Sequence, residues 1–142
     1  MANWTMDLNK YCKDKEVEIK EIRKAYAFAL YSSIVKKTPH DTGRARANWN
    51  VSVGAPDTSV TEQGRERPKP KSSMPEPQGD ESIFICNNLP YIEKLEYGGY
   101  SKNSKSGKTV NGYSKQAPEG MVGVTLANNE AIFNAALRSV KK

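Results

Sequence analysis

Residues 7–37 carry apolar side chains at steps of three and four residues, which places them on one stripe of an amphipathic α-helix. Charged residues occupy the other side. Lys15 interrupts the stripe, which indicates that the first turns are less buried. A helix of this length would span roughly 45 Å, more than a compact domain of this size needs. The stripe consists of Leu8, Tyr11, Cys12, Ile19, Ile22, Tyr26, Ala29, Leu30 and Ser33.

Two interpretations of this helix are open. It is either a long helix of the core or a helix whose first half packs on another subunit. The helix should end at Thr38, because Pro39 disfavours helical geometry in the residue before it.

A tight turn is predicted after the helix, in the sequence Thr38-Pro39-His40-Asp41-Thr42-Gly43-Arg44-Ala45-Arg46-Ala47-Asn48-Trp49. Asp41 and Thr42 can bind backbone amides, while Gly43 supplies a permissive backbone. We therefore expect the turn to aim Arg44 and Arg46 away from the end of the helix. The alternating residues that start at Trp49 are typical of a half-buried strand. Trp49 should anchor this strand to the long helix.

Residues 55–80 show no apolar periodicity and contain five prolines. A structureless stretch of about 25 residues inside a compact domain is uncommon and usually means function or disorder. The prolines favour an extended, polyproline-like arm. This arm would also explain why only 37% of the residues are hydrophobic. Its basic residues are Arg65, Arg67, Lys69 and Lys71.

Two elements are predicted after the arm. The segment 82–87 is apolar on both faces, which is typical of a central strand covered above and below. The segment 91–97 predicts a short helix with Tyr91 and Leu95 on one side. Gly98 and Gly99 should end this helix as a left-handed stop.

The tetrapeptide at residues 99–102 returns unchanged at residues 112–115. The residues between the two copies are small, polar and basic, so residues 99–116 are predicted to form an inserted, exposed loop. One hypothesis makes this loop a hairpin whose arms are the two tetrapeptides. The loop contains Lys102, Lys105, Lys108 and Lys115 and no acidic residue.

A helix is predicted towards the C-terminus. Pro118 and Glu119 suit a helix start, since proline fits the first turn and an acid favours the positive helix end. Residues 121–126 are ambiguous: a helix from about Glu119 is favoured, but their alternation also fits a strand. The elements together predict an α+β fold of a single domain, residues 1–142. Its long N-terminal helix and its C-terminal helix would pack on a small, mostly antiparallel sheet, with long exposed loops.

The composition argues against chemistry that needs converging side chains. Cys12 and Cys86 are too few and too far apart for a disulfide framework or a paired-cysteine metal site, and each is interpreted as a buried hydrophobic residue. The single histidine, His40, is interpreted as a solvated turn residue. We therefore expect no enzymatic activity, no cofactor and no metal. No apolar run approaches the ~18 residues of a membrane span, and no signal segment is evident, so we expect synthesis in a cytoplasm and no membrane partner.

The formal net charge of +6 raises the question of nucleic acid as a partner. Basic residues of the loop and of the turn could contact phosphates and give salt-dependent binding. The charge is moderate, however, and no reading helix or stacking sheet is evident. Solubilising charge on exposed loops is the simpler interpretation, with non-specific contact to DNA as the remaining option.

Three segments of the chain resemble, in the same order, motifs of one protein family. Residues 38–49 resemble the TP-x-DTG-R-x-R-x-x-W turn of the small head–tail joining and tail-completion proteins of long-tailed bacteriophages. Residues 87–98 are similar to that family's N-x-x-x-Y-x-x-x-x-E-x-G segment, and residues 116–121 to its QAP-x-GM segment. The Pro-rich arm and the Gly-Tyr-Ser-Lys insertion depart from the pattern, and both fall between the motifs.

The resemblance implies a structural protein of the virion at the head-proximal end of a phage tail. Such an α+β subunit would assemble into a homo-oligomeric ring, commonly a hexamer, coaxial with the tail tube. Its partners would be tail-tube or terminator proteins and neck or connector proteins, with genomic DNA passing through the lumen. The protein would be synthesised in the host cytoplasm. The alternatives are another minor tail or tail-terminator protein, or a small basic nucleic-acid-binding domain.

Two sets of candidate residues follow. Those with predicted structural roles are Thr38, Pro39, Asp41, Thr42, Gly43, Trp49, Tyr91, Glu96, Gly98 and Pro118. Those predicted to lie at interfaces are Arg44, Arg46, Arg65, Arg67, Lys69, Lys71, Tyr97, Tyr100, Lys102, Lys105, Lys108, Tyr113 and Lys115.

Overall fold

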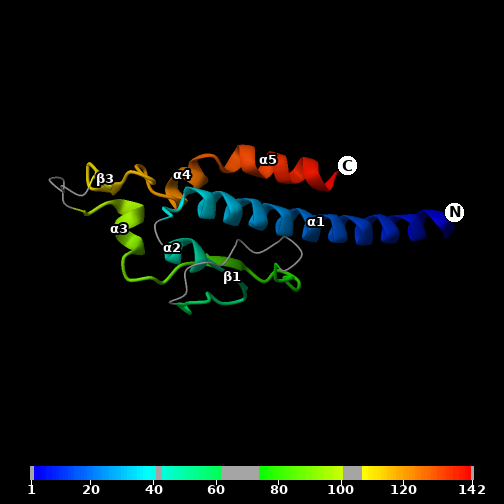
Figure 1. Cartoon of the computed structure of the whole chain (residues 1–142). Coiled ribbons are helices and arrows are strands. Elements are labelled where there is room, and N and C mark those ends of the chain that lie inside the picture. The colour runs from blue at the N-terminus through cyan, green and yellow to red at the C-terminus, as the bar shows by residue number, and fades with distance from the viewer. Residues whose placement is uncertain (1, 41–42, 62–73, 101–106, 142) are drawn as a thin grey trace.

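The computed structural model describes residues 2–40, 43–61, 74–100 and 107–141, with the side chains of the first helix described from Leu8 on, and has an α+β fold (Figure 1). The helices are α1 (Ala2–Lys37), α2 (Arg44–Ala47), α3 (Ile92–Tyr97), α4 (Val122–Ala127) and α5 (Asn129–Val140). The strands are β1 (Asn50–Val53), β2 (Ile83–Cys86), β3 (Thr109–Val110) and β4 (Tyr113–Ser114). The sequence predicted the long N-terminal helix, the C-terminal helix and one small, mostly antiparallel sheet; the structure has two antiparallel sheets of two strands each.

Helix α1 is covered from two sides along its C-terminal half. Figure 1 shows α5 lying along α1 in the opposite direction, with α2 and β1 on the other side of α1. The rings of Tyr26 and Phe133 meet edge to face with their centroids 5.2 Å apart, which fastens α5 to α1. The core lies between α1, the first sheet and the segments that follow it. Its buried apolar residues are Ala27, Tyr31, Ile34, Val35, Ala45, Trp49, Val51, Met74, Leu89, Leu95, Ala117 and Met121.

This arrangement corrects part of the predicted stripe of α1. Because the helix has neighbours on two sides, its most buried positions include Ala25, Ala27 and Tyr31, none of which belongs to the predicted stripe. Tyr26, which does belong to it, is half-buried. The N-terminal part of the stripe has no cover in the described chain. Cys12 is therefore exposed, and its interpretation as a buried hydrophobic residue is wrong; Cys86 is half-buried.

Strands β1 and β2 form a two-stranded antiparallel sheet in which Val51 lies opposite Ile85 and Val53 opposite Ile83. The expectation of a central strand at residues 82–87 is thus wrong, since among the described residues β2 has one neighbouring strand, β1, and all four residues of β2 are half-buried. Its apolar character has a different cause: Ile83 and Ile85 pack against the core.

The described ends of the Pro-rich arm are tied to the body of the protein. Asn50 Nδ2 donates to the carbonyl of Ser59 at 2.9 Å on one side. On the other side, Met74 and Pro77 are buried, and Met74 belongs to the core. The composition had suggested that the arm lies outside the core, but this end of the arm contributes to the core.

The hairpin in the inserted loop differs from the predicted one. β4 comes from the second tetrapeptide, but it pairs with β3, which lies between the two copies. In the first copy, the N–H groups of Gly99 and Tyr100 both donate to the carbonyl of Gly112 at 3.0 Å. Helix α3 ends at the two glycines as predicted, and both have positive φ values, 80° and 121°. Gly98 is not in the left-handed helical conformation that was expected, since its ψ is −167°.

The helix interpretation of residues 121–126 is confirmed, with a correction. Helix α4 begins at Val122 rather than near Glu119, because Gly120 has a φ of 85°, outside the helical region. Asn128 then separates α4 from α5, so the predicted single helix is two helices. In the part of the chain that the structure describes, no helix is long and apolar enough to cross a membrane.

Candidate assembly surfaces

The turn after α1 is held by one buried threonine. The hydroxyl of Thr38 donates to the carbonyl of Ile34 at 2.7 Å and accepts the indole N–H of Trp49 at 2.8 Å. Thr38 and Trp49 expose only 1% and 6% of their surface. The predicted anchoring of the strand to the long helix by Trp49 is therefore confirmed.

Arg46 lies against the end of α1, which contradicts the expected outward aim. Its Nε donates to the carbonyl of Thr38 at 2.8 Å, and a terminal nitrogen lies 3.5 Å from the carbonyl of Lys36. The last carbonyls of a helix lack partners within the helix and carry partial negative charge, so a guanidinium is a favourable partner there. Arg44 is directed to the ring of Tyr91, with its guanidinium carbon 5.8 Å from the ring centroid.

Arg46→Ala should lower the free energy of unfolding by about 1–2 kcal/mol, because the end of α1 loses a charge-assisted hydrogen-bond partner. Urea unfolding followed by circular dichroism measures this loss. Lys36→Ala is the matched control, since Lys36 is an exposed cation in the last turn of α1, the helix end that Arg46 contacts. Equal losses in the two variants would show that Arg46 contributes only its charge.

The three segments that resemble phage motifs are far apart in the sequence but are in contact in the structure. The side-chain amide of Asn87 donates to the carbonyl of Ala45 at 2.9 Å, which joins the second segment to the first. The backbone N–H of His40 donates to the side-chain oxygen of Gln116 at 2.7 Å, which joins the first to the third. His40 is exposed, as expected.

Glu96 joins the second segment to the third. Its Oε2 accepts the N–H groups of Met121 and Val122, and its Oε1 accepts that of Gly123, each at 2.8 Å. The carboxylate thus caps the N-terminus of α4, where the backbone N–H groups have no partner within the helix. A Cβ on Gly120 would lie 2.5 Å from the carbonyl oxygen of Glu96, so only glycine allows α3 to come this close.

The hairpin end of the molecule consists of residues 92–100 and 107–115, that is, α3 and the β3–β4 hairpin. Figure 1 shows it at the opposite end from the N-terminus of α1. Tyr97 is 77% exposed there. The ammonium of Lys94 lies 5.7 Å from the ring centroid of Tyr100. Burial raises the pKa of the Tyr100 phenol, and the nearby Tyr91 adds to the rise.

Other predicted interface residues of this end divide into two groups. The ring of Tyr113 lies 3.1 Å from where a Cβ of Gly98 would be, so this tyrosine packs on the chain and is only half-exposed. Lys108 and Lys115 are exposed. Two candidates for structural roles, Asp41 and Thr42, lie outside the described residues. So do six interface candidates: Arg65, Arg67, Lys69, Lys71, Lys102 and Lys105.

The free half of α1, residues 8–19, extends beyond the C-terminal end of α5 (Figure 1). Near this point Lys141, which directly follows α5, forms an ion pair with Glu18 of α1 at 3.7 Å. Glu18 also pairs with Lys15 at 3.0 Å, and this bond raises the pKa of Lys15. The apolar stripe continues past this point, and Leu8, Tyr11 and Ile19 each expose about half of their surface.

Sequence reasoning missed the role of Asn48, which is 1% exposed. Its amide nitrogen donates to the carbonyls of Arg44 and Thr61, and its oxygen accepts the N–H of Thr61 at 2.7 Å. Asn48 also lines a cleft of about 270 Å³ beside Trp49 and Asp57. The sequence gives no periodic signal for this role, since both partners are backbone groups.

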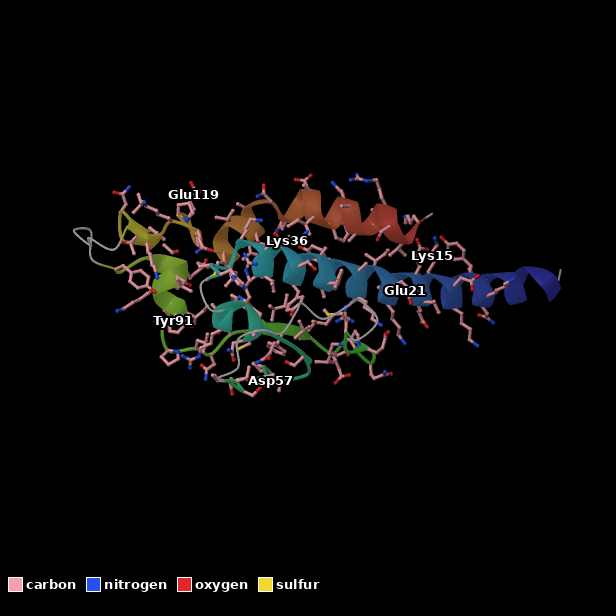
Figure 2. The ribbon with its side chains drawn as sticks, viewed as in Figure 1. Lys15, Glu21, Lys36, Asp57, Tyr91 and Glu119 are labelled. Carbon is pink, nitrogen blue, oxygen red and sulfur yellow. The ribbon has the colours of Figure 1, made fainter. Side chains whose placement is uncertain are left out.

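Among the residues that the structure places, no three or more His, Cys, Asp or Glu side chains gather as metal ligands would. Figure 2 shows charged side chains spread along α1 and around the hairpin end.

Comparison with known proteins adds no relative: no family model matches the chain, and no match is found among curated proteins or solved structures.

Proposed function

We propose that this protein is a structural subunit of a phage virion that forms a ring at the head-proximal end of the tail and joins tail to head. One observation carries the proposal. The three segments that resemble the tail-completion motifs are bonded to one another through Asn87, Gln116 and Glu96. Residues that hold three distant segments together explain why these segments would occur together in one family.

The chemistry of the surface supports an assembling protein. The free half of α1 and the hairpin end both expose aromatic or aliphatic side chains, among them Tyr11 and Tyr97. Tyrosine is enriched in protein interfaces, where it combines a large apolar area with a polar tip. The ring, commonly a hexamer in the family, would contact tail-tube or terminator proteins on one side and neck or connector proteins on the other.

Electron microscopy of the purified chain, with and without tail tubes, tests this function. We expect rings, or caps at one end of the tubes, and tails made without the chain should fail to join heads. Tubes that remain uncapped in excess chain would contradict the proposal.

Basic residues such as Lys108 and Lys115 favour DNA as a second candidate partner, either in the ring lumen or for a separate binding domain. A gel-shift experiment at physiological salt distinguishes the cases. Binding of DNA by a monomer that caps no tubes would replace the structural function by a nucleic-acid-binding one.

A further inference from the structure

The free half of α1 is an apolar surface that the described chain leaves uncovered. Leu8 and Ile19 expose 49% and 56% of their surface, and Tyr11 exposes 59%. The stripe lies on the same face of α1 that α5 covers farther along, where Tyr26 meets Phe133. An isolated helix of this length is marginal in water, so a neighbour along the stripe would stabilise it.

Acidic residues border this stripe. Asp14 follows Tyr11 by three residues and Glu16 follows Cys12 by four, so each adjoins the stripe on the helix surface. Glu18 lies on the same face, as its contact with Lys141 shows. Lys15 is the one basic residue within the stripe at residues 8–19, and it is paired with Glu18. The surface therefore fits a partner with exposed apolar groups and a basic border.

The hairpin end has these two properties. Tyr97 and Val110 expose 77% and 43% of their surface. The described lysines of this end, Lys94, Lys108 and Lys115, are all exposed, and the segment 107–115 contains no acidic residue. The exposed acid of this end, Glu93, lies in α3 outside that segment, and the charge of Glu96 is directed to the start of α4.

We propose that the free half of α1 of one copy binds the hairpin end of the next copy. This contact rests on the proposed function: in the proposed ring, it identifies which surface of the neighbouring copy each end of the chain binds. It pairs an acid-bordered apolar stripe with a lysine-rich apolar end, and it uses two different surfaces at opposite ends of one chain. Such a heterologous contact repeats from subunit to subunit and closes into a ring when the rotation allows.

The apolar half of the contact is tested with two matched substitutions on α1. Ile19→Asn should weaken self-association of the full chain about tenfold or more, as loss of a central apolar contact does. Val17→Asn is the control: Val17 is 61% exposed but lies about 160° around the helix from Ile19, so it should leave association unchanged. Sedimentation velocity from micromolar to millimolar concentration measures both. Equal effects of the two variants would overturn the proposal.

The charge half is tested by reversal and rescue. Lys108→Glu with Lys115→Glu makes both ends acidic, and Asp14→Lys with Glu16→Lys makes both ends basic. Each double variant alone should associate about tenfold more weakly or worse, while an equimolar mixture should recover association, because each end then meets an opposite charge. Contact between two α1 helices would leave the first double variant unaffected, and that result would overturn the proposal.

Failure of this contact and failure of the proposed function give different results. If the chain caps tail tubes but every variant associates like the unsubstituted protein, the contact is wrong and the function stands. If association follows the expected pattern but no tubes are capped, the contact stands and the function fails. An unsubstituted chain that stays monomeric throughout the concentration range overturns the contact.

Discussion

Trp49→Ala should lower the free energy of unfolding by about 3–5 kcal/mol, the range for removal of a large aromatic side chain from a core. Trp49 is 6% exposed and lies in the apolar cluster with Tyr31 and Val51. Its indole N–H also binds the hydroxyl of Thr38, which in turn donates to the carbonyl of Ile34. The substitution would therefore leave a cavity and loosen the end of α1 from β1.

Urea unfolding followed by far-UV circular dichroism measures this loss, because that signal reports helix content and does not depend on tryptophan fluorescence. Tyr97→Ala is the matched control, because it removes an aromatic side chain that is 77% exposed and should change stability by less than about 0.5 kcal/mol. A loss below about 1 kcal/mol for Trp49→Ala would contradict a core role and indicate that the tryptophan serves an interface.

Elements with a strong local signal could be predicted from the sequence. The signals for helix α1, for its stop before Pro39 and for the end of α3 at Gly98 each act within a few residues, and all three of these features are confirmed. Burial within α1 could not be predicted in the same way. It depends on which neighbours cover the helix, so the period alone did not indicate that Ala27 and Tyr31 face one layer while Cys12 faces water.

The predictions that failed concern contacts between distant segments. Local turn chemistry suggested that Arg46 points outward, but the carbonyl of Thr38 at the helix end offers a stronger partner than water. An apolar run suggested a central strand, but β2 owes its composition to packing of Ile83 and Ile85 on the core rather than to two neighbouring strands.

The candidate surfaces show the same division. The exposure of the first turns of α1 agrees with the expectation from the stripe that Lys15 interrupts, because such an interruption is a local feature. Tyr97, predicted to lie at an interface, is 77% exposed. The role of Glu96 is different. Its partners, Met121, Val122 and Gly123, lie about 25 residues away and are backbone groups, which carry no side-chain signal. Only the family motif indicated that Glu96 matters, and it did not say how.

Glu96→Ala should therefore lower the free energy of unfolding by about 3 kcal/mol, since it removes three charge-assisted hydrogen bonds and leaves the start of α4 uncapped. Glu96→Gln should lower it by about 2 kcal/mol. The amide keeps an oxygen that can serve Met121 and Val122, but its NH2 group then faces the N–H of Gly123, and the negative charge at the helix N-terminus is lost.

Urea unfolding of both variants, with Glu93→Gln as the matched control, decides whether the cap has this role. Glu93 is an exposed carboxylate on the same short helix, and its substitution should change stability by less than about 0.5 kcal/mol. If Glu96→Gln matched this control, the three hydrogen bonds would contribute little, and another contact would have to hold α3 against α4. A loss for Glu96→Gln that falls between those of Glu93→Gln and Glu96→Ala is the expected order. That order follows because the glutamine keeps part of the cap while the alanine keeps none of it.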